Sequence, residues 1–328
     1  MSSAGPVARR LAAAREAMAA AGIDALVLRP SPDFRLLGGR GRDFLVVTRD
    51  RAAETADPCP WLEGARRVGV DGEMRVRELF GLAVEAELVP AGQVLAPLRL
   101  RKEPEEVAAV GRAALAAEAV LGHARELSWF GATERAMAAR LRVLLLETGC
   151  EKVLSVRVAA GEHTAAPGHR PTDRVINPGD ALLVSLAVRW DGCCAEVARA
   201  FAVAEPPDDF DALYAVVRAA QAAAVTAARP PAAASAVAQA VAQAIDGSGY
   251  GRYAAPGAGR GVGLGTDEGP WLRAGDDTPL EPGMVLCLEA AVHVPDLFGA
   301  RLADVVVCEP DGCAPLTTSP GPLPVLER

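Results

Sequence analysis

Hydrophobic positions along the first 95 residues follow two different spacings. Leucine and alanine recur at helical intervals over residues 6–22, and an apolar run at 23–28 follows Gly22. Short apolar runs at 44–48 and 67–70 predict two more strands, and residues 73–82 predict a helix. Alternating helices and strands indicate a small α/β layer. The proline-bounded stretch 90–97 predicts a linker, so we expect one domain at 1–97 and a second at 98–328.

The second part begins with helices and then changes to strands. Helices are predicted from Pro104 and over 133–148, and strands over 152–159, 181–189 and 196–203, with a hairpin turn at 190–192. Helices at 209–228 and 234–245 follow, then strands near 285–294, 302–308 and the chain end. The glycine-rich stretch 257–265 lacks both a preceding strand and the spacing of a dinucleotide-binding loop.

Composition and charge exclude several classes of protein. Apolar residues make up 51% and charged residues 23% of the 328 residues, which is typical of a globular chain. The net charge of -8 disfavours binding to nucleic acid. We expect no membrane helix, because no apolar run reaches about 18 residues. The seven cysteines include no C-x-x-C pair, and the N-terminal helix carries Arg9, Arg10, Arg15 and Glu16 instead of a signal-peptide core. A cytoplasmic location is therefore expected.

Five strings, in order and at matching intervals, resemble the pita-bread hydrolases, which include prolidases, aminopeptidase P, methionine aminopeptidases and creatinase. They are 98–106 (LRLRKEPEE), 169–180 (HRPTDRVINPGD), 181–201, 257–270 (GAGRGVGLGTDEGP) and 281–312. The resemblance implies an α+β fold: a curved antiparallel sheet covered by helices in two pseudo-symmetric halves, after a small N-terminal α/β accessory domain. It also implies a homodimer.

The same resemblance implies five metal-ligand positions, which hold two aspartates, a histidine and two glutamates in active peptidases. Here they fall on Ser185, Glu196, Arg260, Glu289 and Ala303, so only Glu289 keeps the residue type. Alanine offers no ligand atom, a serine hydroxyl is a poor neutral ligand, and arginine stays protonated. We therefore expect no metal and no other cofactor. Instead, we expect Arg260 to pair with Glu196 and Glu289, either as part of a working site or as a structural relic.

Creatinase implies that hydrolysis without a metal is possible in this family. His169, one residue after the position of the family histidine at Gly168, is the candidate proton carrier, because histidine titrates near neutral pH. Glu196 and Glu289 would hold a cationic group, and Arg260 or Arg301 a substrate carboxylate. His293 and Asp267 are further candidates for substrate binding.

Each candidate also has a purely structural interpretation. Arg301 could form a salt bridge with Asp304, Asp267 could be a solvated charge, and His163 and His123 could be surface histidines. Cys193 and Cys194 are more simply packed thiols than nucleophiles.

Three functions remain open. The first is metal-independent, creatinase-like C–N bond hydrolysis on a small polar substrate or short peptide. The second is a noncatalytic binding module that keeps the pocket. The third is a metal-dependent Xaa-Pro dipeptidase or aminopeptidase.

Overall fold

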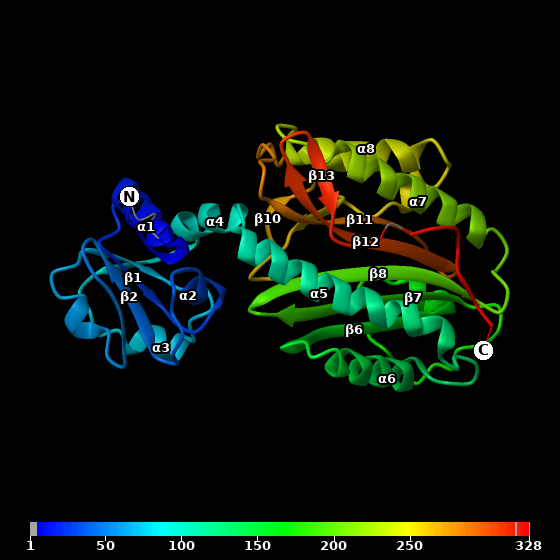
Figure 1. The fold of residues 1–328 in the computed structure, drawn as a ribbon, viewed down its shortest axis with the longest axis horizontal. Coiled ribbons are helices and arrows are strands. Elements are labelled where there is room, and N and C mark those ends of the chain that lie inside the picture. Colours follow the sequence, from blue (N-terminus) through cyan, green and yellow to red (C-terminus); the bar gives the residue numbers. More distant parts are fainter. Residues whose placement is uncertain (1–4, 319, 328) are drawn as a thin grey trace. The chain divides into compact units, whose positions relative to one another are not determined.

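The computed structural model describes residues 5–318 and 320–327. The chain divides into two compact units, Met1–Leu100 and Arg101–Arg328. Figure 1 shows the helices and strands of each unit.

Five strands form the sheet in the described part of the first unit, in the order β3-β2-β1-β4-β5. Strands β1, β2 and β3 pair antiparallel, whereas β4 and β5 extend the sheet in parallel from β1. The strands are β1 (Ala25–Leu28), β2 (Phe44–Thr48), β3 (Ala52–Thr55), β4 (Arg67–Val70) and β5 (Glu87–Pro90), and the helices are α1 (Pro6–Ala21), α2 (Pro32–Leu36), α3 (Val76–Gly81) and α4 (Gly92–Leu100). The mixture of helices and strands is the α/β layer that the hydrophobic pattern predicts.

The prediction of a linker at 90–97 is wrong. Strand β5 ends at Pro90, and α4 continues through Pro97 to Leu100. Val94 and Leu95 are buried, and their burial outweighs the hydrogen bond that Pro97 cannot donate inside the helix. The boundary between the units therefore lies three residues later than the sequence indicates.

Nine strands form the sheet of the second unit within the residues that the structure describes. The main path runs β10-β9-β11-β12-β8-β7-β6, with β13 paired to β12 and β14 paired to β8. The strands are β6 (Lys152–Ala160), β7 (Ala181–Trp190), β8 (Cys193–Val203), β9 (Gly259–Gly261), β10 (Glu268–Trp271), β11 (Val285–Val294), β12 (Phe298–Glu309), β13 (Gly312–Pro315) and β14 (Val325–Leu326). The predicted hairpin is confirmed: Asp191 and Gly192, both with positive φ, join β7 to β8.

Four long helices cover this sheet in two pairs. Helices α5 (Pro104–Gly122) and α6 (Glu134–Glu147) lie along β6, β7 and β8 (Figure 1). Helix α7 (Phe210–Ala227) packs on β11 and β12, and α8 (Ala234–Asp246) packs on α7 and contacts β10. Two helix pairs on a largely antiparallel sheet confirm the predicted α+β class in two halves.

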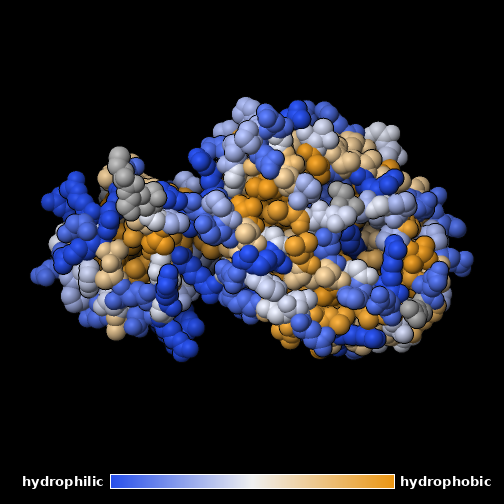
Figure 2. All heavy atoms as spheres, viewed as in Figure 1, coloured by the Kyte–Doolittle hydropathy of each residue, from blue (hydrophilic) through white to orange (hydrophobic). Residues whose placement is uncertain are grey.

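Helix α5 is rich in alanine and other apolar residues. Among the described residues, Pro104–Glu126 is the one helical stretch long and apolar enough to cross a membrane by length and composition. Half of this stretch is buried, and alanines on its inner face pack against β7 and β8. Its outer face includes the exposed Leu115, and Figure 2 shows apolar and polar side chains intermixed over this side of the unit. Packing on the sheet is sufficient to explain its hydrophobicity.

Candidate functional site

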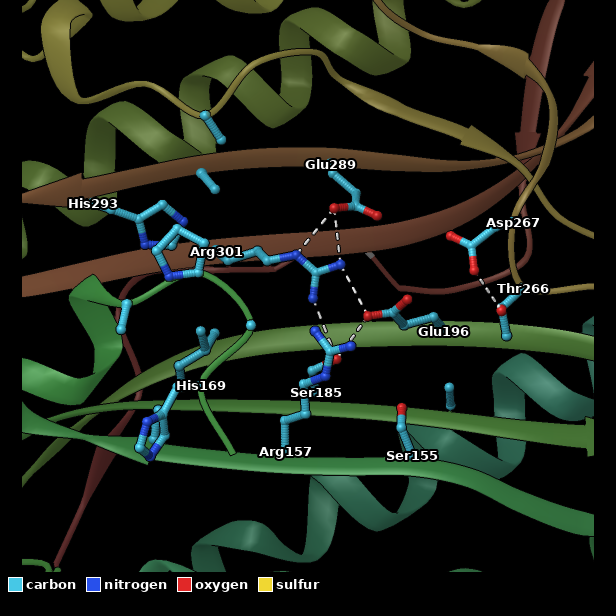
Figure 3. A pocket seen from close by; sticks show the side chains of 18 of the residues that line it. Ser155, Arg157, His169, Ser185, Glu196, Thr266, Asp267, Glu289, His293 and Arg301 are labelled. Carbon is cyan, nitrogen blue, oxygen red and sulfur yellow. Dashed lines mark hydrogen bonds and ion pairs between the residues drawn. The ribbon is translucent and has the colours of Figure 1, made fainter. Parts of the chain in front are cut away.

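A cavity of about 470 Å³ opens on the sheet of the second unit. Its walls come from β6, β7, β8, β9, β11 and β12 together with the loops at 166–169 and 266–267 (Figure 3). On β7, Leu182, Val184 and Leu186 point into the core, whereas the alternate residues 183, 185 and 187 line the cavity. The period of two along a strand therefore places the hydroxyl of Ser185 in the cavity.

Four charged side chains form the centre of this cavity, and we call Glu196, Arg260, Glu289 and Arg301 the Arg–Glu cluster. Arg301 Nη2 lies 2.9 Å from Glu196 Oε1 and 2.8 Å from Glu289 Oε2. Arg260 Nη2 lies 2.6 Å from Glu196 Oε2, and its Nη1 donates to Glu289 Oε1. Each arginine thus bridges both carboxylates, and the two positive charges balance the two negative ones.

Pairing in the cluster lowers the pKa of Glu196 and raises the pKa values of Arg260 and Arg301, which favours their charged forms. Burial disfavours the charged form of Glu196, but Arg301 and Arg260 outweigh it and lower the pKa to about 2. Burial likewise opposes the charge on Arg301, yet Glu196 and Glu289 raise its pKa above the ordinary value. Mutual pairing is therefore what keeps these groups charged away from water.

The five family ligand positions do not fit two metal ions. Ser185 donates a 2.8 Å hydrogen bond to Glu196, and Ala303, opposite Glu289 in the β11–β12 register, offers no ligand atom. The guanidinium of Arg260 brings a positive charge where a ligand should bring a lone pair. Two divalent ions would add four positive charges next to two guanidiniums, with only two carboxylates to balance them.

The structure brings Arg260, Glu196 and Glu289 together, so their predicted pairing is confirmed. The interpretation of Arg301 as a partner of Asp304 is wrong, because Asp304 pairs with Arg199 at 2.6 Å and Arg301 joins the Arg–Glu cluster.

Asp267 lies at the rim of the cavity. Its Oδ1 is 2.6 Å from Arg260 Nε, with 61% of the side chain exposed. Asp267 is thus neither a purely solvated charge nor a buried member of the cluster.

Two of the predicted histidines line the cavity away from the cluster. His169 Nε2 lies 2.8 Å from Oε2 of the buried Glu134, and His293 Nδ1 lies 3.1 Å from the carbonyl oxygen of Thr164. Burial lowers the pKa of His293, against the effect of its bond to Thr164, so this ring is neutral at pH 7. Their roles as proton carrier and substrate contact stay predictions.

The sequence does not predict two residues of this region. Arg157 lies on β6 and lines the cavity, and Glu134 is the first residue of α6. An acidic residue at a helix start is common, and an arginine on a strand is ordinary, so neither carries a local signal. Only the pairing of β6 with β7, and of α6 with the loop at 172–175, brings them to the site.

Burial supports the interpretation of Cys193 and Cys194 as packed thiols. Burial raises the pKa of Cys193 to about 12 and also raises that of Cys194, so neither thiol is activated as a nucleophile.

Comparisons with known proteins agree with this architecture. The model of metallopeptidase family M24 matches residues 107–310. The probable dipeptidase PepE of Mycobacterium tuberculosis is 29% identical over 97% of this chain and 96% of its own length. The crystal structure of dipeptidase PepE from Mycobacterium ulcerans superimposes with a TM-score of 0.89 at 29% identity, covering 98% of each chain. The Xaa-Pro dipeptidase from Bacillus anthracis, 23% identical over 98% of this chain and 100% of its own, shares the fold with a TM-score of 0.91. The chain is thus a member of metallopeptidase family M24 with the pita-bread fold.

Proposed function

We propose that this chain is an M24 homologue without the two-metal centre, whose cavity binds a small molecule or short peptide through a carboxylate group. The observation that carries the proposal is the Arg–Glu cluster. The five ligand positions hold one arginine, two glutamates, a serine and an alanine, and Arg301, which stands outside them, pairs with both glutamates. A chain with this cluster is expected to lack metal-dependent peptidase activity.

One arginine of the cavity lining supports an anionic ligand. Arg157 is exposed, lines the cavity, and makes no hydrogen bond or ion pair with any residue that the structure describes. Figure 3 shows its side chain pointing from β6 into the pocket. The cavity lining carries three arginines and three carboxylates, but all three carboxylates pair with Arg260 or Arg301, so Arg157 is left without a carboxylate partner among the described residues. A planar guanidinium is well suited to a carboxylate, which it can bind with two parallel hydrogen bonds.

The remaining walls set the size and polarity of the ligand. Leu154, Leu183, Ala187, Ala255 and Ala291 give the cavity small apolar surfaces. A cavity of about 470 Å³ lies within the range of small-molecule pockets. A carboxylate attached to a short apolar group, as in a dipeptide, matches both the free guanidinium and these surfaces.

Creatinase-like hydrolysis is less well supported than binding. It needs carboxylates free to hold a cationic group, but Glu196 and Glu289 already accept bonds from both cluster arginines. A cationic substrate would have to displace a guanidinium of the protein itself. His169 lines the cavity and is the residue that would carry the proton in this alternative.

Calorimetry with the dipeptide Ala-Pro and its C-terminal amide tests the proposal. We expect the free acid to bind more tightly than the amide, and Arg157→Ala to weaken the free acid by about 10–100-fold, the value of a charged hydrogen bond. Arg170→Ala, which removes an exposed arginine outside the cavity lining, is the matched control and should bind as the native chain does.

Turnover measurements separate the three functions. With manganese, cobalt or zinc added, we expect no hydrolysis of Ala-Pro. Metal-stimulated cleavage would restore the peptidase interpretation and overturn the proposal. Metal-independent turnover of a small C–N substrate, lost in Glu289→Gln, would instead establish the creatinase-like alternative. Equal binding of acid and amide would refute the role of Arg157.

A further inference from the structure

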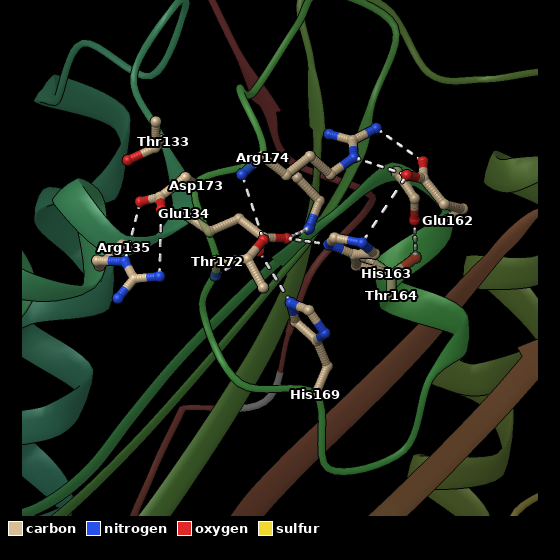
Figure 4. A network of polar contacts seen from close by, with 12 residues as sticks. Thr133, Glu134, Arg135, Glu162, His163, Thr164, His169, Thr172, Asp173 and Arg174 are labelled. Atoms are coloured by element: carbon tan, nitrogen blue, oxygen red, sulfur yellow. Dashed lines mark hydrogen bonds and ion pairs between the residues drawn. The ribbon is translucent and has the colours of Figure 1, made fainter.

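A second polar cluster lies at the edge of the cavity, apart from the five family ligand positions. Glu134, His163 and His169 come from three separate segments, and Figure 4 shows both imidazole rings turned toward the carboxylate. His163 Nδ1 lies 3.0 Å from Glu134 Oε1, and His169 Nε2 lies 2.8 Å from Oε2. The two rings are 4.2 Å apart between centroids. Three potential ligand atoms, one from each residue, therefore lie within 4.8 Å of one another.

The start of α6 holds Glu134 in this place. Thr133 caps the helix by accepting a 3.2 Å hydrogen bond from the Ala136 N–H, and Glu134 follows as the first helical residue. The backbone N–H of Glu134 donates to the carbonyl of Arg174 at 3.0 Å. The carboxylate is completely buried, whereas 12% of the His169 side chain and 30% of the His163 side chain are exposed. The site thus has one buried carboxylate that is held in place and two imidazole rings that solvent can reach.

The donor types and their spacing suit a transition metal. Two imidazole nitrogens and one carboxylate form a common three-residue set for zinc, with the fourth position left for water. In a tetrahedral site with bonds of about 2.0–2.1 Å, ligand atoms lie about 3.4 Å apart. The three donor atoms already lie within 4.8 Å of one another. Combined shifts of up to about 1.4 Å in the two partly exposed rings would therefore admit an ion.

A second layer of contacts already orients these ligands. The Glu134 carboxylate accepts hydrogen bonds from the backbone N–H of Ala160 at 2.9 Å and from the N–H and hydroxyl of Thr172 at 2.9 and 2.8 Å. Metal-binding carboxylates are typically held in this manner.

The other face of His163 has an acidic neighbour. His163 Nε2 lies 4.0 Å from Glu162 Oε1, and two hydrogen bonds of 2.8 and 3.0 Å from Arg174 fix that carboxylate. At 4.0 Å this contact is not a hydrogen bond, and the carboxylate acts through its negative charge, which favours a cation at this ring.

We propose that Glu134, His163 and His169 bind one divalent transition metal ion, with zinc favoured by the donor set. This site is independent of the Arg–Glu cluster, and it departs from the expectation of no metal, which rests only on the five family positions. As a ligand, His169 would hold the ion at the edge of the cavity and would not act as the proton carrier.

Titration of the purified, metal-stripped chain with Zn²⁺ by calorimetry, and with Co²⁺ by visible absorption, tests the site. We expect one equivalent of each ion and the absorption of tetrahedral cobalt. His163→Asn and His169→Gln each place an amide near the lost ring nitrogen, so Glu134 keeps a donor and the fold is preserved. Each substitution should weaken binding by about 100-fold or more, and Glu162→Gln by about tenfold.

Two matched controls locate the ion. Ser185→Ala changes a family ligand position without altering the charge of the Arg–Glu cluster, and His123→Asn changes an exposed histidine at the end of α5. Both variants should bind the ion as the native chain does. X-ray absorption of the zinc-loaded native chain should show two imidazole ligands and no sulfur. Binding lost in Ser185→Ala, binding unchanged in both ligand-histidine variants, sulfur ligation, or no binding at all would each overturn the proposal.

Discussion

Substituting Arg301 by methionine tests whether the Arg–Glu cluster holds the centre of the sheet together. The substitution keeps most of the apolar stem and removes a guanidinium that contacts Glu196 and Glu289 at 2.8–3.0 Å. One arginine would then face two carboxylates with little access to water. Breaking a buried ion pair costs about 3–5 kcal/mol. For a unit of this size, that corresponds to a fall in Tm of roughly 6–20 °C.

Tryptophan fluorescence during thermal unfolding reports mainly on the second unit, which contains the Arg–Glu cluster. Three of the four tryptophans, at 129, 190 and 271, lie in Arg101–Arg328. Arg112→Met is the matched control: it removes an exposed pair with Asp191, which is worth about 0–1 kcal/mol.

A double substitution adds the decisive comparison. Arg301→Met with Glu289→Gln restores the balance of charge, so it should be more stable than the sum of the single effects predicts, by about 0.5–3 kcal/mol. A loss below about 1 kcal/mol in Arg301→Met, or additive effects in the double variant, would refute the reasoning.

Three further predictions concern stability at low pH, the reactivity of the cysteines and the cap of helix α6. The folded-state pKa of Glu196, about 2, lies below its ordinary value of 4.5, so its ionisation stabilises the fold above pH 4.5 and this contribution is lost as the pH falls toward 2. Unfolding midpoints should therefore fall less steeply over this range in Glu196→Gln, and an unchanged slope would contradict the assignment. Iodoacetamide should modify the partly exposed Cys59 before the buried Cys193, and mass spectrometry of the peptides measures the order. Rapid labelling of Cys193 would contradict its interpretation as an unreactive packed thiol. Thr133→Ala should cost about 1 kcal/mol through the lost cap of α6, whereas Thr133→Ser should cost much less in the same denaturation assay.

Much of the fold could be predicted because its signals are local. Apolar periodicity located β1, β2, β4 and the long strands of the second unit, and Asp191 and Gly192 marked the hairpin between β7 and β8. The short strands β3 and β5 were missed, because Ala52–Thr55 and Glu87–Pro90 contain few buried positions. Their place depends on pairing with β2 and β4, which a local pattern does not encode.

The site was predictable only in part. Aligned family positions were enough to pair Arg260 with Glu196 and Glu289, since all three stand where the family holds metal ligands. Arg301 was predicted to bind a substrate carboxylate, with a salt bridge to Asp304 as the structural alternative. Its partners on β8 and β11 were not predicted, because they lie far from it in the sequence. Glu134 and His169 are 35 residues apart in the sequence. Hydrogen bonds between the loop at 172–175 and the start of α6 bring them together, and no local pattern indicates those bonds.

The reciprocal contacts of the Arg–Glu cluster constrain how such a centre can evolve. Some arginine codons are one base change from a histidine codon, so position 260 could exchange these two residues in a single step. With Arg301 in its present place, however, histidine at 260 alone would leave Glu196 with one cationic partner, and Ser185 and Ala303 would supply no carboxylate to hold a metal. The two-metal centre that the family resemblance implies would therefore need several coordinated substitutions at these positions.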